Sequence, residues 1–84
     1  MRARDDIKKA IEAALRKEFP TDTVDISDGY RDNIHVLVVS RKFDDMPDRV
    51  QDDMLWTLIE EAGLSDDEKK LISLVMPASP ALLK

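Results

Sequence analysis

The 84-residue chain predicts an α+β fold, a two-layer sandwich in which helices cover one face of a three-stranded sheet. Three observations indicate this fold class. An amphipathic helical repeat opens the chain, a strand that is apolar on both faces lies in its middle, and a capped amphipathic helix follows that strand. The expected order is helix, strand, strand, helix, short helix, strand, in a single domain spanning 1–84.

The first half of the chain predicts one helix and a β-hairpin. After Asp5 and Asp6, apolar residues recur every three or four positions, the spacing of one helix face, until Pro20 ends the run. From Thr21 to Ser27 apolar and polar residues alternate, as in a half-buried strand. The turn-forming residues Asp28 to Asn33 then allow the chain to reverse direction.

The central strand and the second helix have clear signals. The stretch from Ile34 to Ser40 is β-branched and apolar on both faces, which is typical of a central strand. Asp44 to Pro47 place carboxylates and a proline where a helix begins, and Gly63 stands where a left-handed cap would end it after Ala62. The expected apolar stripe of this helix is Val50, Met54, Leu55, Leu58, Ile59 and Ala62.

The last third of the chain predicts a short helix and a third strand. Leu64 to Lys69 is typical of one capped helical turn, and Leu71 to Met76 of a strand that Pro77 and Pro80 stop. The tail is too short for an independent element. It has three residues that could dock as a final turn, namely Ala81, Leu82 and Leu83.

Composition excludes several classes of protein. Apolar residues are 43% of the chain and charged residues 37%, as in globular proteins. The chain has no cysteine, so it has no disulfide framework and no thiolate metal site or nucleophile, and we expect a cytoplasmic protein. No run approaches the ~20 apolar residues of a membrane span. The formal charge of −5 disfavours nucleic acid unless a local basic patch exists.

Residues that usually support catalysis or metal binding are scarce. His35 is the one histidine, and on its strand it has no neighbour in the sequence to orient it, so we expect a structural role and no enzymatic activity. The acidic clusters lack the spacing and glycine of a calcium loop, so we expect neither a metal nor another cofactor. These clusters are Asp44 and Asp45, Asp52 and Asp53, Glu60 and Glu61, and Asp66 to Glu68.

The element order, the strand that ends in Val38-Val39-Ser40 and the Phe43 that follows it resemble the BolA family over nearly the whole chain. The segment 51–56 aligns with the family's helix-two signature, in which Arg-His-Arg precedes two aliphatic residues and a Tyr. The segment 70–74 aligns with its third strand. The resemblance implies a fold similar to the type-two KH domain, which is the order expected above.

Four positions depart from the family pattern. Its helix-two histidine is Asp52 here, its third-strand histidine is Lys70, its loop histidine is Asn33, and the glycine after the Phe is Asp45. The resemblance implies pairing with a monothiol glutaredoxin and a share in holding an iron-sulfur cluster through a histidine. Because no matching histidine and no cysteine are present, the chain keeps the predicted fold without the metal site.

We therefore expect a non-enzymatic adaptor that binds a protein partner of the glutaredoxin or iron-sulfur-assembly type. The expected surface is helix two, the loop before it and the tail. Phe43 and Trp56 would anchor the partner, and Arg41 and Arg49 would orient an acidic one. Trp56 lies off the apolar stripe, either under the tail or exposed to a partner. The predicted partner-binding residues are Arg41, Lys42, Phe43, Arg49, Asp52 and Trp56.

Two alternatives remain open. Arg41, Lys42 and Arg49 bracket the loop where KH domains clamp a nucleic-acid backbone, so a KH-like nucleic-acid-binding or transcription-regulatory module is the second interpretation, although the Gly-x-x-Gly turn is absent. The other concerns the sheet. Alternation puts a second apolar set, His35, Leu37 and Val39, on the face without an obvious helix, and a homodimer through that face would cover it.

Overall fold

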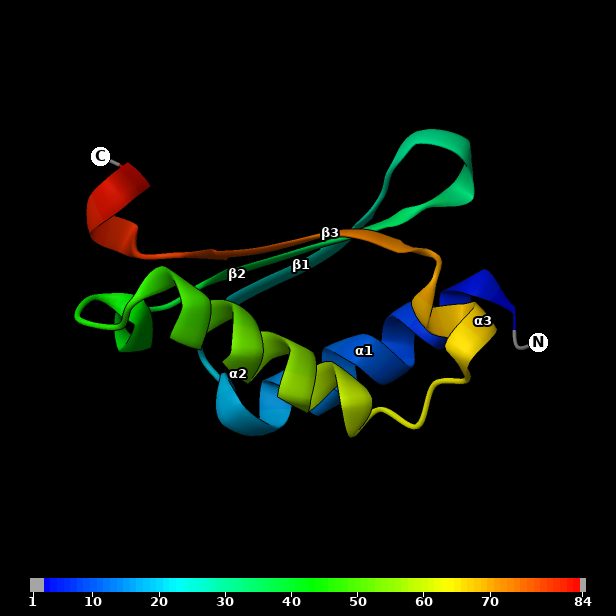
Figure 1. Ribbon diagram of the computed structural model, residues 1–84, viewed down its shortest axis with the longest axis horizontal. Helices are drawn as coiled ribbons and strands as arrows, with labels where there is room; N and C mark the ends of the chain where they lie inside the picture. Colours follow the sequence, from blue (N-terminus) through cyan, green and yellow to red (C-terminus); the bar gives the residue numbers. More distant parts are fainter. Residues whose placement is uncertain (1–2, 84) are drawn as a thin grey trace.

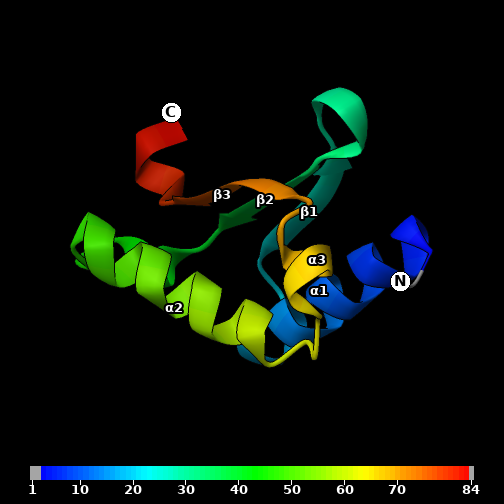
Figure 2. The same cartoon turned by 45° about the vertical axis from the view of Figure 1, so that its right-hand side comes forward.

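The computed structural model describes residues 3–83, and it confirms the α+β fold class. Its elements are α1 (Arg4–Glu18), β1 (Thr23–Asp28), β2 (Ile34–Val39), α2 (Asp48–Glu60), α3 (Asp66–Lys69) and β3 (Ile72–Ala78). Three single 3-10 turns are η1 (Tyr30–Asp32), η2 (Arg41–Phe43) and η3 (Pro80–Leu83). The helices lie on one face of the sheet, as predicted (Figure 1, Figure 2). The expected docking of Leu82 and Leu83 concerns side chains outside those that the structure describes.

The sheet has the order β1-β2-β3, so the strand predicted to be central is central. β1 and β2 form the expected antiparallel hairpin, in which Thr23 is opposite Val39. β3 runs parallel to β2, with Val36 opposite Val75, and its register shifts by one residue near Ile34. A parallel pair needs a long connection, and α2 and α3 supply it.

The core lies between the sheet and the two long helices. One side of β2 is fully buried, because its alternate residues face α1 and α2. Residues at helical spacing on α1 and α2 pack against these β2 side chains. Phe43 of η2 closes one end of this core. The fully buried apolar side chains are Ile7, Ile11, Leu15, Phe19, Ile34, Val36, Val38, Phe43, Leu55 and Ile59. Within residues 3–83, no helix is long and apolar enough to cross a membrane.

The apolar stripe of α2 differs from the prediction at its first position. Val50 is 43% exposed, whereas Gln51 is only 9% exposed and forms one line with Leu55 and Ile59. This line faces the interior of the molecule, where the amide of Gln51 donates to two backbone carbonyls of the segment that precedes α2. The assignment of Val50 to the buried stripe was wrong, and that of Leu55 and Ile59 is confirmed.

The prediction that Pro77 stops the third strand was wrong, since β3 extends to Ala78. The Ser40 amide donates to the Ala78 carbonyl at 3.0 Å, so the backbone of Ala78 faces β2. Its neighbour Pro77 therefore faces the open edge, because backbone groups alternate along a strand. Proline lacks an N–H, and on an edge strand this costs no hydrogen bond of the sheet.

The predicted caps are present. Ser65 and Glu68 form a reciprocal capping box at the start of α3, and Gly63 adopts φ +74°, a left-handed conformation that favours glycine.

The N-terminal part of α1 holds the tip of the β1–β2 hairpin. Arg4 donates to Asp28 at 3.0 Å and to the backbone carbonyls of Asp32 and Asn33. Lys8 donates to the same Asp28 oxygen, also at 3.0 Å. The tip is thereby fixed relative to the helical layer.

Candidate protein-binding surface

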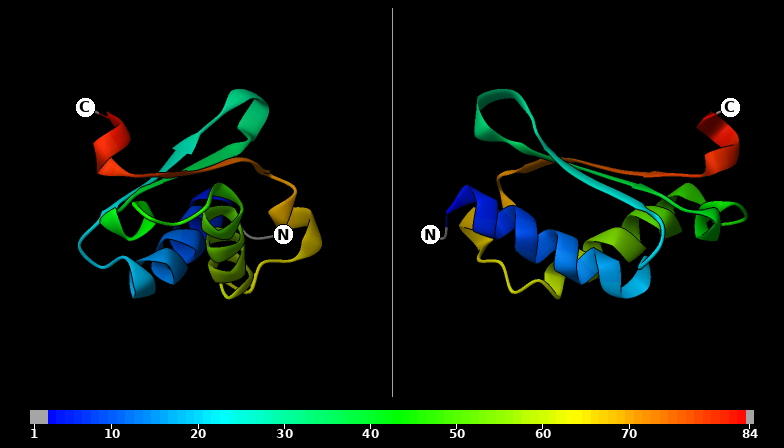
Figure 3. Two further views of the ribbon diagram at one scale, coloured as in Figure 1. Left: turned by 60° about the vertical axis from the view of Figure 1, so that its left-hand side comes forward. Right: turned by 180° about the vertical axis from the view of Figure 1, so that it is seen from behind.

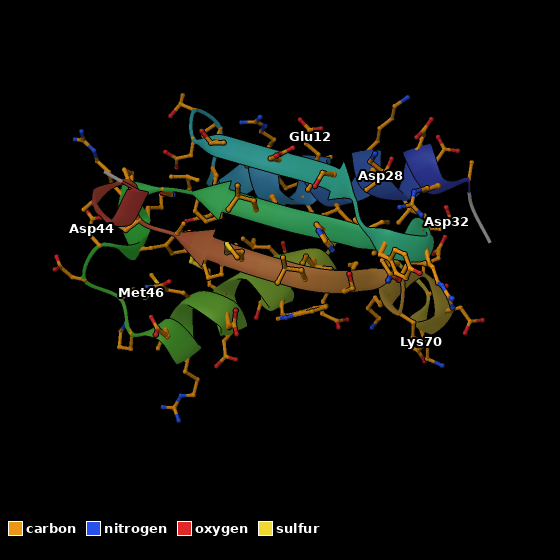
Figure 4. The ribbon with its side chains drawn as sticks, turned by 90° about the horizontal axis from the view of Figure 1, so that it is seen from above. Glu12, Asp28, Asp32, Asp44, Met46 and Lys70 are labelled. Atoms are coloured by element: carbon orange, nitrogen blue, oxygen red, sulfur yellow. The ribbon has the colours of Figure 1, made fainter. Side chains whose placement is uncertain are left out.

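The loop that joins β2 to α2 is held at its start by a buried serine. We call residues 40–47 the β2–α2 loop; Asp44 and Met46 mark it in Figure 4. Ser40 is 1% exposed, donates from Oγ to Asp22 Oδ2 at 2.8 Å, and accepts from the Lys42 amide at 3.1 Å. The start of the loop is therefore fixed to the segment that precedes β1.

Gln51 holds the middle of this loop against α2. Its side-chain amide donates to the Phe43 carbonyl at 3.1 Å and to the Met46 carbonyl at 2.6 Å. The Phe43 carbonyl also accepts from the Met46 amide at 3.1 Å, so Gln51 matters most for the Met46 carbonyl. The sequence reasoning missed this role, although the spacing of Gln51 from Leu55 and Ile59 was a signal for it.

Two of the predicted contact residues belong to the scaffold of the surface. Lys42 donates to the Glu18 carbonyl at 2.6 Å and to its Oε1 at 3.0 Å, and its ammonium group lies 5.2 Å from the Phe19 ring centroid. Phe43 is 1% exposed, and its ring centroid is 5.5 Å from that of Phe19. The prediction that Phe43 anchors a partner is wrong, because its side chain is part of the core.

The C-terminal segment lies against the same loop. The Ser79 hydroxyl, which is buried, donates to the Asp44 carboxylate and accepts from the Ala81 amide at 3.3 Å. Sequence reasoning placed the tail in the surface but gave no sign of this contact, since the two partners are 35 residues apart. Four separate segments therefore hold the β2–α2 loop in one conformation.

The other four predicted residues are exposed. Arg41 lies on the loop, and Arg49, Asp52 and Trp56 lie on the solvent side of α2 at intervals of three and four residues. Trp56 has 37% of its surface exposed. Within residues 3–83, neither arginine forms an ion pair, whereas Lys42 is neutralised by Glu18. The two arginines and the tryptophan are thus available to a partner.

The charge around this surface is acidic on balance. Between Arg41 and Trp56 the chain has three basic residues and five aspartates, and one of the basic residues, Lys42, is already paired. A phosphate backbone would meet net repulsion here. The local charge therefore disfavours the KH-like nucleic-acid alternative.

An open cleft of about 540 Å³ lies beside the loop, between the ends of β1 and β2. Two of its polar residues, Ser40 and Asp22, are hydrogen-bonded to each other, and Lys42 is bound to Glu18. Within residues 3–83, no three histidine, cysteine or acidic side chains form a group that could hold a metal ion. The cleft is lined by Thr21, Asp22, Thr23, Val39, Ser40, Arg41, Lys42 and Pro80.

The positions that align with the family's histidines lie in different parts of the molecule. Asn33 and Lys70 are at one end of the sheet, because the Ile34 amide that follows Asn33 donates to the Leu71 carbonyl at 2.7 Å. The β2–α2 loop, with Asp44, is at the other end (Figure 4). Asp52 is exposed on α2.

Together the fold and the surface define a small α+β domain with a fixed loop and one helix face presented outward. Among solved structures, the chain is similar to the NMR structure of a BolA-like hypothetical protein from Rickettsia prowazekii, with a TM-score of 0.61 and 19% identity. The match covers 84% of this chain and 91% of that chain. No protein-family model and no curated protein matches the sequence. The chain thus has the BolA-like fold that its sequence predicts.

Proposed function

We propose that this chain is a non-enzymatic, BolA-like adaptor that binds a protein partner through the exposed side of α2 and the β2–α2 loop. The observation that carries the proposal is the exposed Trp56 in line with the exposed Arg49 on α2. Tryptophan and arginine dominate the energetics of protein interfaces. Arg41 adds a second exposed guanidinium group from the adjoining loop.

The rigidity of the loop supports this role. A loop that already has its bound conformation loses little conformational entropy on binding, so more of the contact energy appears as affinity. Ser40, Gln51 and Ser79 supply this order from three directions. Phe43 contributes from within, by filling the core under the loop.

The family resemblance indicates the class of partner, a monothiol glutaredoxin or an iron-sulfur-assembly protein. Asp52 stands where the family has its helix-two histidine, and a carboxylate is a poor substitute for imidazole as an iron ligand. The proposed adaptor therefore contributes a protein surface, and the partner supplies the ligands of any cluster.

The test is a calorimetric titration of the full chain with a monothiol glutaredoxin from the same organism. Trp56→Ala removes the proposed anchor and is expected to weaken binding about 30-fold, the equivalent of about 2 kcal/mol. Arg49→Glu is also expected to weaken binding, and the loss of affinity should be larger at low salt than at high salt. Val50→Ala is the matched control, since Val50 is a similarly exposed apolar residue on another side of the same helix.

Three results would count against the proposal. Unchanged affinity in both Trp56→Ala and Arg49→Glu would remove the surface, and absence of binding would remove this class of partner. A loss of visible iron-sulfur absorption from the complex in Asp52→Ala would show that the chain does supply a ligand.

A further inference from the structure

The face of the sheet opposite the helices has an apolar half. Leu74 and Met76 of β3 are 41% and 46% exposed, and they lie beside His35 and Leu37 of β2 in the parallel register. Figure 4 looks down on this face, with the three strands in front and the helices behind. Within residues 3–83, no helix covers it.

The other half of this face is polar. Asp25 of β1 is paired with Leu37 of β2, which in turn is paired with Met76 of β3. One row of side chains therefore crosses the sheet from a carboxylate to a thioether. Asp25 is exposed and forms no ion pair with any residue from 3 to 83. Its neighbours on this side of β1 are also polar and exposed, namely Thr23 and Ser27.

Both ends of the face are flanked by segments that rise away from the helical layer. The hairpin tip stands at one end and η3 at the other (Figure 1, Figure 3). The tip is folded closely onto its end of the sheet, since a Cβ added at Gly29 would lie 2.4 Å from Nε2 of His35. An occupant must fit between these two segments.

The dimensions match one helix better than a second copy of the domain. β2 has six residues, so the face is about 20 Å long, and its outer strands are about 10 Å apart. The resulting footprint of roughly 200 to 300 Å² is far below the ~800 Å² per partner of a stable interface between folded domains. An α-helix about 10 Å across covers this width, and ~13 residues cover the length.

Charge also disfavours a symmetric pair of copies. The twofold axis of a face-to-face pair lies in the plane between the two sheets. If the axis runs parallel to β2 above Leu37, Asp25 of one copy meets Met76 of the other copy. If it runs across the strands, Asp25 meets another Asp25. Both arrangements place an unpaired carboxylate against an unsuitable neighbour.

We propose that this face binds an amphipathic helix of about 13 residues from another protein, with its apolar stripe on Leu37, Leu74 and Met76 and a basic side chain directed to Asp25. The surface is separate from the one used in the proposed function, because α2 lies on the other side of the sheet. The same molecule would then have one binding surface on each layer.

The test is an NMR titration of the full-length, nitrogen-15-labelled chain with two synthetic helical peptides. They share one leucine stripe, and one has lysines along its flank where the other has glutamates. The lysine peptide is expected to shift the amide signals of Leu37, Leu74 and Met76 and to bind roughly two- to fivefold tighter than the glutamate peptide. Asp25→Lys is expected to reverse that preference.

Two matched controls separate a defined site from general attraction to an acidic chain. Asp53→Lys, on the solvent side of α2, changes the net charge by the same amount as Asp25→Lys. It should leave the preference for the lysine peptide unchanged. Met76→Glu should abolish the shifts, whereas Val50→Glu, at a similarly exposed apolar residue, should keep them. Each variant is first checked for an unchanged fold by its amide spectrum.

Three outcomes would overturn the proposal. The first is no shift of these signals by either peptide at millimolar concentration. The second is that the peptides shift the amide signals of Met76→Glu as much as those of the unchanged protein. The third is a dimer, seen by light scattering, that Met76→Glu dissociates, because the occupant would then be a second copy of the chain.

Discussion

Gln51 shows how a single polar residue can organise a surface. Its amide has two donor hydrogens, and each meets one carbonyl of the β2–α2 loop. Because the residue is 9% exposed, water does not readily replace either contact. The loop conformation therefore depends on this side chain more than on any exposed residue of α2.

Replacing Gln51 by alanine is expected to destabilise the protein by about 1 to 3 kcal/mol, because the Met46 carbonyl loses the Gln51 donor and the Phe43 carbonyl keeps only its bond from the Met46 amide. Urea unfolding measures the change, and Asp52→Ala, at the next and exposed position, is the control, with an expected effect within about 0.5 kcal/mol. Equal stability of the two variants would show that the two hydrogen bonds add nothing to the fold.

Asp28 links the hairpin to α1 in a manner that depends on pH. Hydrogen bonds from Lys8 and then Arg4 hold the pKa of the Asp28 carboxyl below its ordinary value of 3.8. The unfolded chain therefore takes up the proton first as the pH falls. The stabilisation is complete above about pH 4 and is lost as the pH falls through the lowered pKa of the folded state.

We expect Asp28→Asn to flatten the acid limb of the stability curve below pH 4, since amide and carboxyl are alike once the latter is protonated. Thermal unfolding from pH 2 to pH 7 measures this. Asp25→Asn, which removes a carboxylate with no ion pair among residues 3–83, should leave the limb unchanged. A wild-type limb that Asp28→Asn does not alter would contradict the assignment.

At the scale of the elements, β3 is protected by its proline. An edge strand with free N–H groups is a template for pairing with other chains, and Pro77 removes one such donor from the open edge. This explains how an exposed strand with Leu74 and Met76 on one side can be tolerated.

Replacing Pro77 by threonine is expected to change stability by no more than about 0.5 kcal/mol, because no hydrogen bond of the sheet depends on this position. It is expected to speed aggregation on mild heating, measured by light scattering, because the edge gains a donor. Ser73→Thr adds a β-branched residue to the same strand without a new donor. Equal aggregation of both variants would rule out a protective role for Pro77.

The elements that sequence reasoning predicted correctly have local signals. The periodicity of α1, the capping box at Ser65 and the glycine at position 63 each depend on a few neighbouring residues. Two of the errors concern long-range contacts. The burial of Phe43 requires Phe19 of α1, and the choice of Gln51 over Val50 requires the carbonyls of a loop whose path only the tertiary structure defines.

The surface itself was predicted only in part. Arg41, Arg49, Asp52 and Trp56 are exposed, and the three on α2 lie off the apolar stripe that the sequence indicates. The internal pairing of Lys42 could not be read from the sequence, since it depends on where α1 ends. The tail's contact with Asp44 through Ser79 was equally hidden.

At the scale of the whole molecule, charge argues for protein partners. The chain has a formal charge of −5, and its two proposed surfaces contain aspartates at or beside their centres. Electrostatic steering would bring basic or mixed surfaces to this protein and would keep polyanions away.

Single-stranded RNA is therefore expected to bind with a dissociation constant no tighter than ~10⁻⁴ M at physiological salt, the weak end of non-specific binding. Fluorescence anisotropy with a labelled single-stranded RNA of ~12 nucleotides measures this dissociation constant. Micromolar binding that weakens steeply with salt would instead revive the KH-like interpretation.

The parallel pairing of β2 with β3 has a consequence for the order of folding. The hairpin of β1 and β2 can form early, but the far edge of β2 stays unpaired until α2 and α3 have brought the last strand alongside. Until then, Ile34 to Val39 is an open, apolar template of the kind that aggregates. A nascent or truncated chain that ends before Ile72 would need a chaperone more than the finished protein does.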